Sequence, residues 1–421
     1  MWSPTDFETS DTPNDQAMKI AFVHPNWPGN EGTGATHSAL RIVSGLAERG
    51  HELTVYCTTP PPDGADVNPD MTLKPLHCSG YPYHSDHQLN RALRERIEEF
   101  DAYDITHSYL LGSIPAMGDI AERTATATVV TLNAYRGICP KNDLRYLDRK
   151  PCPSNGIVKC TACSIATSGG HSEYGRAYRS AGRLGNLKLV RESERTADRI
   201  DGYHALSPHV KETYAGFGYP DDRISVIPNI LDERFCRNGN HDFEEPYELL
   251  YVGSLDEHKG VDKLVPILDR LRQQSGSAFR LTVVGDGGLR SELERQATAR
   301  GLDAAVSVPG RLPNESLPDV FASHDLFVYP GRWDEPFGRV FLESLAAGTP
   351  VIASDVGSVE DIIGDGGVVT DGSVGALSVA IEEVCDTDTL ATLSSAARRT
   401  VKAYRPETVL PEFIELYDRL R

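Results

Sequence analysis

Apolar residues along the chain alternate between short continuous runs and helically spaced positions. Residues 19–23 form a short apolar run, residues 35–48 carry apolar side chains at helical spacing, and residues 53–57 are again a short run. This strand–helix–strand order predicts parallel strands joined by crossover helices, and therefore an α/β fold. Further strands of this first series are predicted at residues 73–76, 105–107, 128–132, 202–206 and 224–227.

A second series of the same kind follows a polar segment without periodicity, residues 232–246, where we place a domain boundary. Each series predicts one doubly wound, Rossmann-like domain, residues 18–232 and residues 246–406. We expect the amphipathic segment 407–421 to form a helix that packs back on the N-terminal domain. The second series contains predicted strands at 248–252, 280–284, 305–308, 326–329 and 350–353, and predicted helices at 261–274, 289–300 and 338–347.

Composition and charge narrow the classes of function. The 421 residues are 39% hydrophobic, and no apolar run approaches the roughly 18 residues of a membrane span. The formal net charge of −19 repels nucleic acid, so we expect no DNA or RNA partner. Basic charge is carried mostly by arginine, which suits a halophilic, salt-adapted organism; a merely acidic mesophilic enzyme is the alternative. Residues 1–17 lack the features of a signal peptide and predict a disordered tail, so we expect a cytoplasmic protein.

The segment 333–343 (WDEPFGRVFLE) carries the candidate chemistry of the second series. Pro336 stands where a helix would begin after a predicted strand, because proline is tolerated in a first helical turn. The backbone N–H groups of Phe337, Gly338 and Arg339 would then point at a ligand. The positive end of a helix favours phosphate or sugar oxygens, so these groups are candidates for donor binding.

Two acids, Glu335 and Glu343, bracket this predicted helix start. They would lie about 12 Å apart along a helix axis, which is too far for a general acid–base pair acting on one bond. The separation suits two contacts with one elongated ligand, Glu335 with sugar hydroxyls and Glu343 with a ribose. A capping acid and a solvated helix face are the alternative interpretation.

The sequence around these acids resembles the retaining glycosyltransferases of family four (group one), whose GT-B fold has two Rossmann-like domains facing a cleft. A glutamate, seven residues and a second glutamate are the hallmark of that family, and EPFGRVFLE at 335–343 matches it. VIPNILD at 226–232 is similar to the VIPNGVD segment that precedes the family's second domain. The resemblance covers about residues 18–421. It implies transfer of a sugar from a nucleoside-diphosphate donor to a hydroxyl acceptor, with cell-surface glycan or glycolipid synthesis as the expected setting.

The resemblance also implies roles for residues of the second series. Glu335 is similar to the glutamate that binds the transferred sugar, Glu343 to the glutamate that binds ribose, and Lys259 to the lysine that pairs with the donor diphosphate. Ser254 stands where the family usually has an arginine, so Lys259 and the helix start would carry more of the phosphate charge. Another arginine is the alternative, and the candidates are Arg332 and Arg339.

In the first series the resemblance is weaker. His107 is similar to the family histidine that faces the transferred sugar, and a core histidine is the alternative interpretation. The glycine loop 29–34 resembles the loop that approaches the donor phosphates, and Gly34 opens the following helix. Asn133 stands where family members often have a histidine, which leaves the acceptor contacts on this side open.

The mechanism that we expect is transfer across the cleft with retention of configuration. The acceptor hydroxyl attacks from the face that the diphosphate leaves, and the diphosphate itself takes the acceptor proton, since no side-chain nucleophile is evident. We expect no catalytic metal, because no aspartate pair is present to hold one. A GT-B-like sugar-nucleotide epimerase and a non-catalytic nucleotide-sugar-binding relative are the alternatives.

Four cysteines cluster in an insertion at residues 136–170 that is rich in proline, glycine and lysine. Four thiolates in an irregular loop suit a structural zinc, and an iron–sulfur cluster is a second option. Free or incidentally paired thiols are the alternative. The four residues are Cys139, Cys152, Cys160 and Cys163.

Residues 171–199 are locally basic on this acidic chain. They could contact an anionic membrane surface, which would place the protein at the inner face of a membrane, or a phosphorylated acceptor. A solvated helix face with acidic partners is the alternative. The basic residues are Arg176, Arg179, Arg183, Lys188, Arg191, Arg195 and Arg199.

Overall fold

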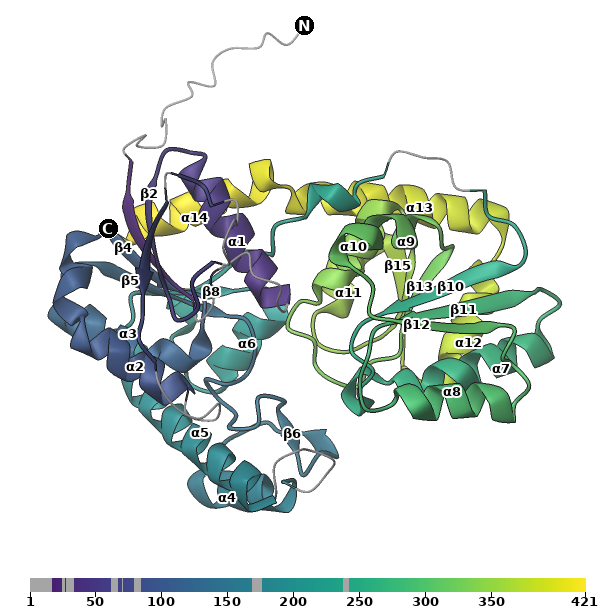
Figure 1. Cartoon of the computed structure of the whole chain (residues 1–421), viewed down its shortest axis with the longest axis horizontal. Coiled ribbons are helices and arrows are strands. Elements are labelled where there is room, and N and C mark those ends of the chain that lie inside the picture. The colour runs from purple at the N-terminus through teal and green to yellow at the C-terminus, as the bar shows by residue number, and fades with distance from the viewer. Residues whose placement is uncertain are drawn as a thin grey trace, which may run out of the picture. The chain divides into compact units, whose positions relative to one another are not determined.

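The computed structural model describes residues 17–24, 27, 34–61, 67–69, 71–78, 85–168, 176–237 and 242–421. These residues form two compact units (Figure 1). The first unit consists of the described residues up to Thr131 together with Thr196–Tyr203 and Leu410–Arg421, and the second consists of the described residues of Leu132–Arg195 and His204–Val409. Nearly all of the predicted N-terminal tail and the glycines of the loop 29–33 lie outside the described residues.

Seven strands form the first sheet, in the order β3-β2-β1-β4-β5-β8-β9. The pairing is parallel where its register is defined: Ile20 of β1 lies opposite Leu53 of β2 and Ile105 of β4. The central strands are almost completely buried, which is typical of parallel strands covered on both faces, although β4 contributes the polar side chains of Thr106, His107 and Ser108. The strands are β1 (Lys19–Val23), β2 (Glu52–Cys57), β3 (Met71–Pro75), β4 (Ile105–Ser108), β5 (Ala127–Leu132), β8 (Gly202–Ala205) and β9 (Ile224–Val226).

Helices cover the first unit on two sides, with α1 near α14 and α2 beside α3 (Figure 1). Two glycines allow the C-terminal helix to lie close to its neighbours. A Cβ at Gly45 of α1 would collide with Leu410, and a Cβ at Gly202 of β8 would collide with Leu420. The helices are α1 (Gly34–Ala47), α2 (Ser85–Glu95), α3 (Ile114–Arg123) and α14 (Pro406–Leu420), of which the last belongs to the first unit from Leu410 onward.

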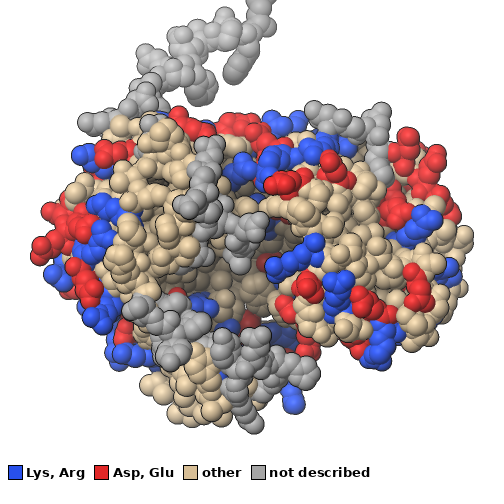
Figure 2. Space-filling view, viewed as in Figure 1, with Lys and Arg blue, Asp and Glu red and all other residues tan. Residues whose placement is uncertain are grey.

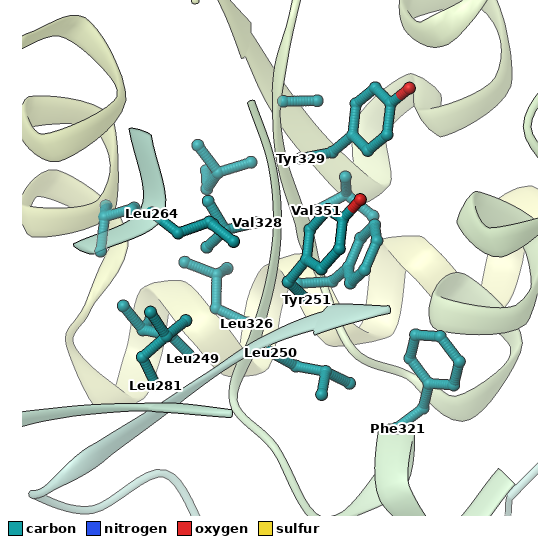
Figure 3. Close-up of a cluster of buried hydrophobic side chains, with 14 of the residues drawn as sticks. Leu249, Leu250, Tyr251, Leu264, Leu281, Phe321, Leu326, Val328, Tyr329 and Val351 are labelled. Carbon is teal, nitrogen blue, oxygen red and sulfur yellow. The ribbon is translucent and has the colours of Figure 1, made fainter. Parts of the chain in front are cut away.

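The second sheet has six parallel strands in the order β12-β11-β10-β13-β14-β15. Its core includes apolar side chains of β10, β11, β13 and β14 together with Leu264 and Phe321 from neighbouring helices (Figure 3). The α/β architecture with two parallel sheets confirms the predicted fold class. The strands are β10 (Tyr247–Val252), β11 (Phe279–Val284), β12 (Val306–Gly310), β13 (Leu326–Tyr329), β14 (Val351–Ser354) and β15 (Gly367–Thr370).

Helices lie on both faces of this second sheet. Helices α7, α8 and α12 are on one face, and α9, α10, α11 and α13 are on the other (Figure 1). The helices are α7 (Leu264–Gln274), α8 (Arg290–Ala299), α9 (Leu317–Ala322), α10 (Arg339–Ala347), α11 (Val359–Ile363), α12 (Val374–Val384) and α13 (Thr387–Thr400).

The segment between β5 and β8 contains the predicted cysteine-rich insertion. A short hairpin of β6 (Arg145–Tyr146) and β7 (Lys150–Pro151) is followed by α4 (Ile157–Ala166) and the long helix α5 (Arg176–Thr196). After β8 comes α6 (Pro208–Gly216), which begins with Ser207 as its N-cap.

The surface carries charges of both signs. Acidic and basic side chains are interspersed over the visible face (Figure 2). Among the described residues, no helix combines the length and the apolar character that crossing a bilayer requires.

Candidate functional site

Lys259 is positioned by a close approach of two loops at the ends of strands β10 and β13. It ends a short 3₁₀ helix, Glu257–Lys259, and Gly260 follows with a φ of 69°, a left-handed conformation that ends the turn. A Cβ at Gly260 would collide with the carbonyl oxygen of Pro330, so glycine is needed for this approach. The result is that Lys259 lies beside Glu335, although 76 positions separate the two residues.

Glu335 receives two hydrogen bonds at the same oxygen. Lys259 Nζ lies 2.6 Å from Glu335 Oε2, and the Tyr329 hydroxyl donates to that oxygen at 2.9 Å. The side chains of Lys259 and Glu335 are only 18% and 11% exposed. Burial, together with the negative charge of Glu335, raises the pKa of Tyr329 well above its ordinary value, so the phenol remains a proton donor. No sequence motif marks Tyr329, although it occupies the carboxyl end of a buried parallel strand, where such contacts are expected.

The backbone around Glu335 is fixed by two buried serines. The Ser358 hydroxyl donates to the carbonyl oxygen of Pro336 at 2.8 Å, and the Ser207 hydroxyl reaches the same oxygen at 3.0 Å. The backbone N–H of Ser358 donates to the Glu335 carbonyl at 2.9 Å. A Cβ at Gly357 would collide with the backbone of Glu335. The carboxylate is therefore presented by a loop that has little freedom to move.

Helix α10 begins at Arg339, within one residue of the helix predicted at 338–347. It does not begin at Pro336, where the proline favours a first turn, because Gly338 adopts a φ of 72° and interrupts the helical conformation. The backbone N–H groups of Phe337 and Gly338 precede the helix and have no acceptor within the described part of the chain. The side chain of Phe337 is buried, with its ring centroid 6.0 Å from that of Tyr404. The amides of the loop remain available to a ligand even though the helix starts after them.

Glu343 lies one turn into α10 beside Arg339, whose Nη2 is 3.5 Å from Glu343 Oε1. Burial raises the pKa of Glu343 above that of an ordinary carboxyl, although Arg339 acts in the opposite direction. Ser254 is exposed, and its carbonyl accepts a hydrogen bond from Tyr251. Of the two candidate substitutes for the missing arginine, Arg332 is bound by both carboxylate oxygens of Asp262, at 2.5 and 2.6 Å.

His107 and Gly34 belong to the first unit and are described there. His107 is fully buried on β4, with Nδ1 2.6 Å from the Tyr417 hydroxyl and Nε2 2.7 Å from the Thr131 hydroxyl. Both ring nitrogens are therefore engaged inside the unit, which is the arrangement of a core histidine, the alternative interpretation of this residue. Gly34 is the exposed first residue of α1, as the sequence predicts.

The four clustered cysteines line one small cavity of about 20 Å³. All four are free thiols. Two of the sulfurs accept backbone hydrogen bonds, Cys160 from Gly156 at 3.4 Å and Cys163 from Leu147 at 3.3 Å. Across the described ranges, no group of three or more His, Cys, Asp or Glu side chains is arranged to hold a metal ion. The predicted zinc or iron–sulfur centre at Cys139, Cys152, Cys160 and Cys163 stays a prediction.

Some basic residues of the stretch 171–199 pair with acidic side chains of the described chain, and others do not. Residues 171–175 lie outside the described residues. Lys188 lies 3.6 Å from Glu192, and Arg191 lies 2.8 Å from Glu194, as expected for a solvated helix face. Arg179 and Arg183 form no ion pair within the described chain.

Two family models match the chain, and they meet near residues 232–235, where the second series of strands and helices is preceded by a polar segment. Residues 32–235 match the model described as Glycosyltransferase Family 4, and residues 232–400 match the model described as Glycosyl transferases group 1. Together the two models cover the chain from residue 32 to residue 400.

Curated relatives match part of the chain. Glycogen synthase of Mycobacterium tuberculosis is 34% identical over 221 residues, covering 52% of this chain and 50% of the relative. O-antigen chain mannosyltransferase B of Escherichia coli is 30% identical over 191 residues, covering 43% of this chain and 50% of the relative. The match thus spans about half the length of these relatives.

Solved structures match almost the whole chain. Anabaena HepE in complex with UDP has a TM-score of 0.68 at 19% identity, covering 96% of this chain and 100% of the other. Sucrose-phosphate synthase of Thermosynechococcus elongatus has a TM-score of 0.69 at 20% identity, covering 96% and 99%. At these identities the likeness concerns the fold.

Proposed function

The chain belongs to the glycosyltransferases of family 4 (group 1) and has their GT-B fold, and on this premise we propose that it transfers a sugar from a nucleoside-diphosphate donor to a hydroxyl acceptor with retention of configuration. The observation that supports this proposal most is the carboxylate of Glu335. It is held by Lys259 and Tyr329 and is followed directly by two backbone amides without an acceptor.

The proposed donor occupies the loop after β13 and the first turns of α10. Lys259 and the N–H groups of Phe337 and Gly338 bind the diphosphate, where a charge-assisted hydrogen bond contributes roughly 1.5–3 kcal/mol. Glu335 accepts hydrogen bonds from hydroxyls of the transferred sugar, and Glu343 accepts them from the ribose. The solved neighbour HepE was crystallised with UDP and with UDP-glucose, so a uridine nucleotide is the first donor to test.

The proposed reaction breaks the bond between the anomeric carbon and the diphosphate oxygen and forms a bond from that carbon to the acceptor oxygen on the same face. The acceptor proton passes to the departing diphosphate. Lys259 stabilises the negative charge that develops on this leaving group, and the fixed loop around Glu335 positions the sugar. The route that we propose uses no metal ion, and it gives no role to His107, whose side chain is fully buried. Cell-surface glycan or glycolipid synthesis is the setting that we propose for the reaction.

The test is donor binding and turnover with UDP-, GDP- and ADP-sugars. A donor that binds the folded state raises the melting temperature, and Lys259→Met should abolish most of that increase. The matched control is Arg280→Gln, which removes an exposed cation paired with Glu248 on the same sheet. Conversion of the donor to an isomeric sugar nucleotide without an acceptor would instead indicate an epimerase. Donor binding that is the same in wild type and Lys259→Met would contradict the proposed site.

A further inference from the structure

A second cavity of about 540 Å³ lies in the second unit beside the proposed donor site. Its walls come from the loop after Cys139, from the end of α4 and the start of α5, and from the segments that carry His258 and Trp333. Trp333 connects the two sites, because it lines this cavity and its ring centroid is 5.1 Å from Lys259 Nζ. None of the residues that we propose to contact the donor lines the cavity.

Positive charge is concentrated in this cavity, although the chain as a whole has a net charge of −19. Two of the cations are neutralised by carboxylates. Lys141 pairs with Asp148 and, at 3.1 Å, with Asp143, and Arg332 pairs with Asp262. The cationic residues that line the cavity are Lys141, Arg145, Arg179, Arg183 and Arg332.

The other three guanidinium groups form no ion pair in the described chain, although the carboxylates of Asp143, Asp148 and Glu257 also line the cavity. Arg145 donates to backbone carbonyls, and Arg183 donates to a carbonyl and, at 2.7 Å, to the Thr167 hydroxyl. The buried Nη1 of Arg179 has no partner. None of the three pairs with a carboxylate anywhere in the part of the chain that the structure describes. Guanidinium groups in this state bind phosphate oxygens well, because their planar N–H forks match the geometry of the anion.

The loop that carries Lys141 and Arg145 is held in a conformation that its residues rarely adopt. Four of its residues have positive φ without being glycine: Asn142 at 66°, Leu144 at 50°, Leu147 at 52° and Asp148 at 59°. They are the only such residues in the described chain. Strain of this kind persists where the surroundings impose it and is concentrated at binding sites. A further donor, Trp333 Nε1, is buried at the cavity without a hydrogen-bond partner.

We propose that this cavity binds a phosphoryl group of the acceptor through Arg145, Arg179 and Arg183, and so places the acceptor hydroxyl near the donor. Its volume lies within the roughly 300–1,000 Å³ range of small-molecule sites and exceeds what inorganic phosphate needs. The occupant is therefore a phosphorylated sugar or polyol, either free in solution or as the headgroup of a lipid. The inference rests on the proposed transferase function and adds the chemical class of the acceptor.

Equilibrium binding tests the inference with two phosphate probes. The soluble probe is glucose 1-phosphate, with glucose as its uncharged control, followed by titration calorimetry. The lipid probe is a vesicle of equimolar phosphatidylinositol and phosphatidylcholine, with phosphatidylcholine vesicles as control, followed by co-sedimentation. The variants are Arg183→Gln and Arg179→Gln. Arg195→Gln is the matched control, because Arg195 is exposed on the same helix and lies outside the cavity.

We expect Arg183→Gln to weaken binding of the phosphate probe about tenfold or more, as loss of one charge-assisted hydrogen bond implies. Arg195→Gln should stay within about twofold of wild type, and saturating UDP should not compete with the probe. Replacing Arg183 also removes its hydrogen bond to Thr167, which could disturb the local structure. Arg179→Gln is therefore the second variant, because, within the described chain, Nη1 of Arg179 forms no hydrogen bond that the substitution would break. Binding of glucose 1-phosphate indicates a soluble acceptor, and binding of the vesicles alone indicates a lipid headgroup.

The inference is overturned if neither probe binds wild type, if binding is the same in both variants and wild type, or if UDP displaces the probe. Displacement by UDP would assign the arginines to the donor diphosphate instead. Failure of the transferase proposal has a different signature. In that case no donor is turned over, while phosphate binding still depends on Arg179 and Arg183.

Discussion

Glu335→Gln removes one negative charge from the centre of the proposed site and keeps the shape of the side chain. In the structure this carboxylate accepts hydrogen bonds at 2.6 Å from Lys259 and at 2.9 Å from Tyr329. A glutamine oxygen can still accept from one of them, so the loop should keep its conformation. The variant loses the negative charge. In the free protein this charge attracts Lys259, and in the donor complex it strengthens the proposed hydrogen bonds from the sugar hydroxyls.

The magnitude follows from these two contacts. A charge-assisted hydrogen bond to a sugar hydroxyl contributes roughly 1.5–3 kcal/mol, so its loss should lower kcat/KM by about 10- to 150-fold. If the contact strengthens in the transition state, turnover should fall by about 10²–10³. Donor binding through Lys259 should not weaken in this variant. Without the charge of Glu335, Lys259 is more available to the diphosphate, so the KM for the donor should stay level or decrease while kcat falls.

The assay is the initial rate of nucleotide release with and without acceptor, measured over a range of donor concentrations. Arg280→Gln is the control for a general effect of removing a charge, and thermal unfolding checks that each variant folds. A double-mutant cycle with Lys259→Met measures how strongly the two side chains act together. At saturating donor, loss of a group that stabilises the transition state should lower kcat about a hundredfold or more. A kcat of Glu335→Gln within about threefold of wild type would refute the assignment of Glu335 to the transferred sugar.

Three further predictions concern the loops, the second acid and the cysteines. Gly260→Ala should lower the free energy of unfolding, measured by urea denaturation, more than Gly301→Ala does. Both glycines have a left-handed φ, 69° and 67°, but only Gly260 faces a neighbouring carbonyl. Equal losses would show that the two loops can move apart. Burial raises the pKa of Glu343, so the folded state holds that proton more tightly than the unfolded state. Wild type should therefore become less stable relative to Glu343→Gln as the pH rises from the ordinary carboxyl value of 4.5, and a pH-independent difference would argue against this reasoning. Elemental analysis of gently purified protein should find about one zinc per chain in wild type and none in the variant with serine at positions 160 and 163. Wild type that contains neither zinc nor iron would contradict the predicted metal centre.

Strands and helices could be predicted well from the sequence because each depends on a local pattern. The apolar runs 19–23 and 326–329 coincide with β1 and β13, and the helical spacing of 35–48 with α1 within one residue at each end. No sequence pattern predicts strand β15 (Gly367–Thr370). It has four residues, all only partly buried, so neither a long apolar run nor an alternating pattern marks it.

The start of α10 shows the limit of a local rule. Proline favours a first helical turn, which predicts a helix from Pro336, yet the helix begins at Arg339. The left-handed Gly338 and the hydrogen bonds from Ser207 and Ser358 to the Pro336 carbonyl hold the preceding residues outside it. Those serines are 129 and 22 positions away from Pro336, and no pattern within 333–343 reveals them.

The sequence by itself determined the α/β class, the two series of elements and the pair of acids spaced as in family 4, because periodicity and motif spacing are properties of neighbouring residues. Only the tertiary structure decided that Lys259 and Tyr329 meet on one oxygen of Glu335, that His107 is enclosed, and that three arginines without acidic partners share a cavity. These are contacts between residues far apart in the chain. They depend on how loops at the ends of different strands approach one another, which burial and packing of the whole unit decide.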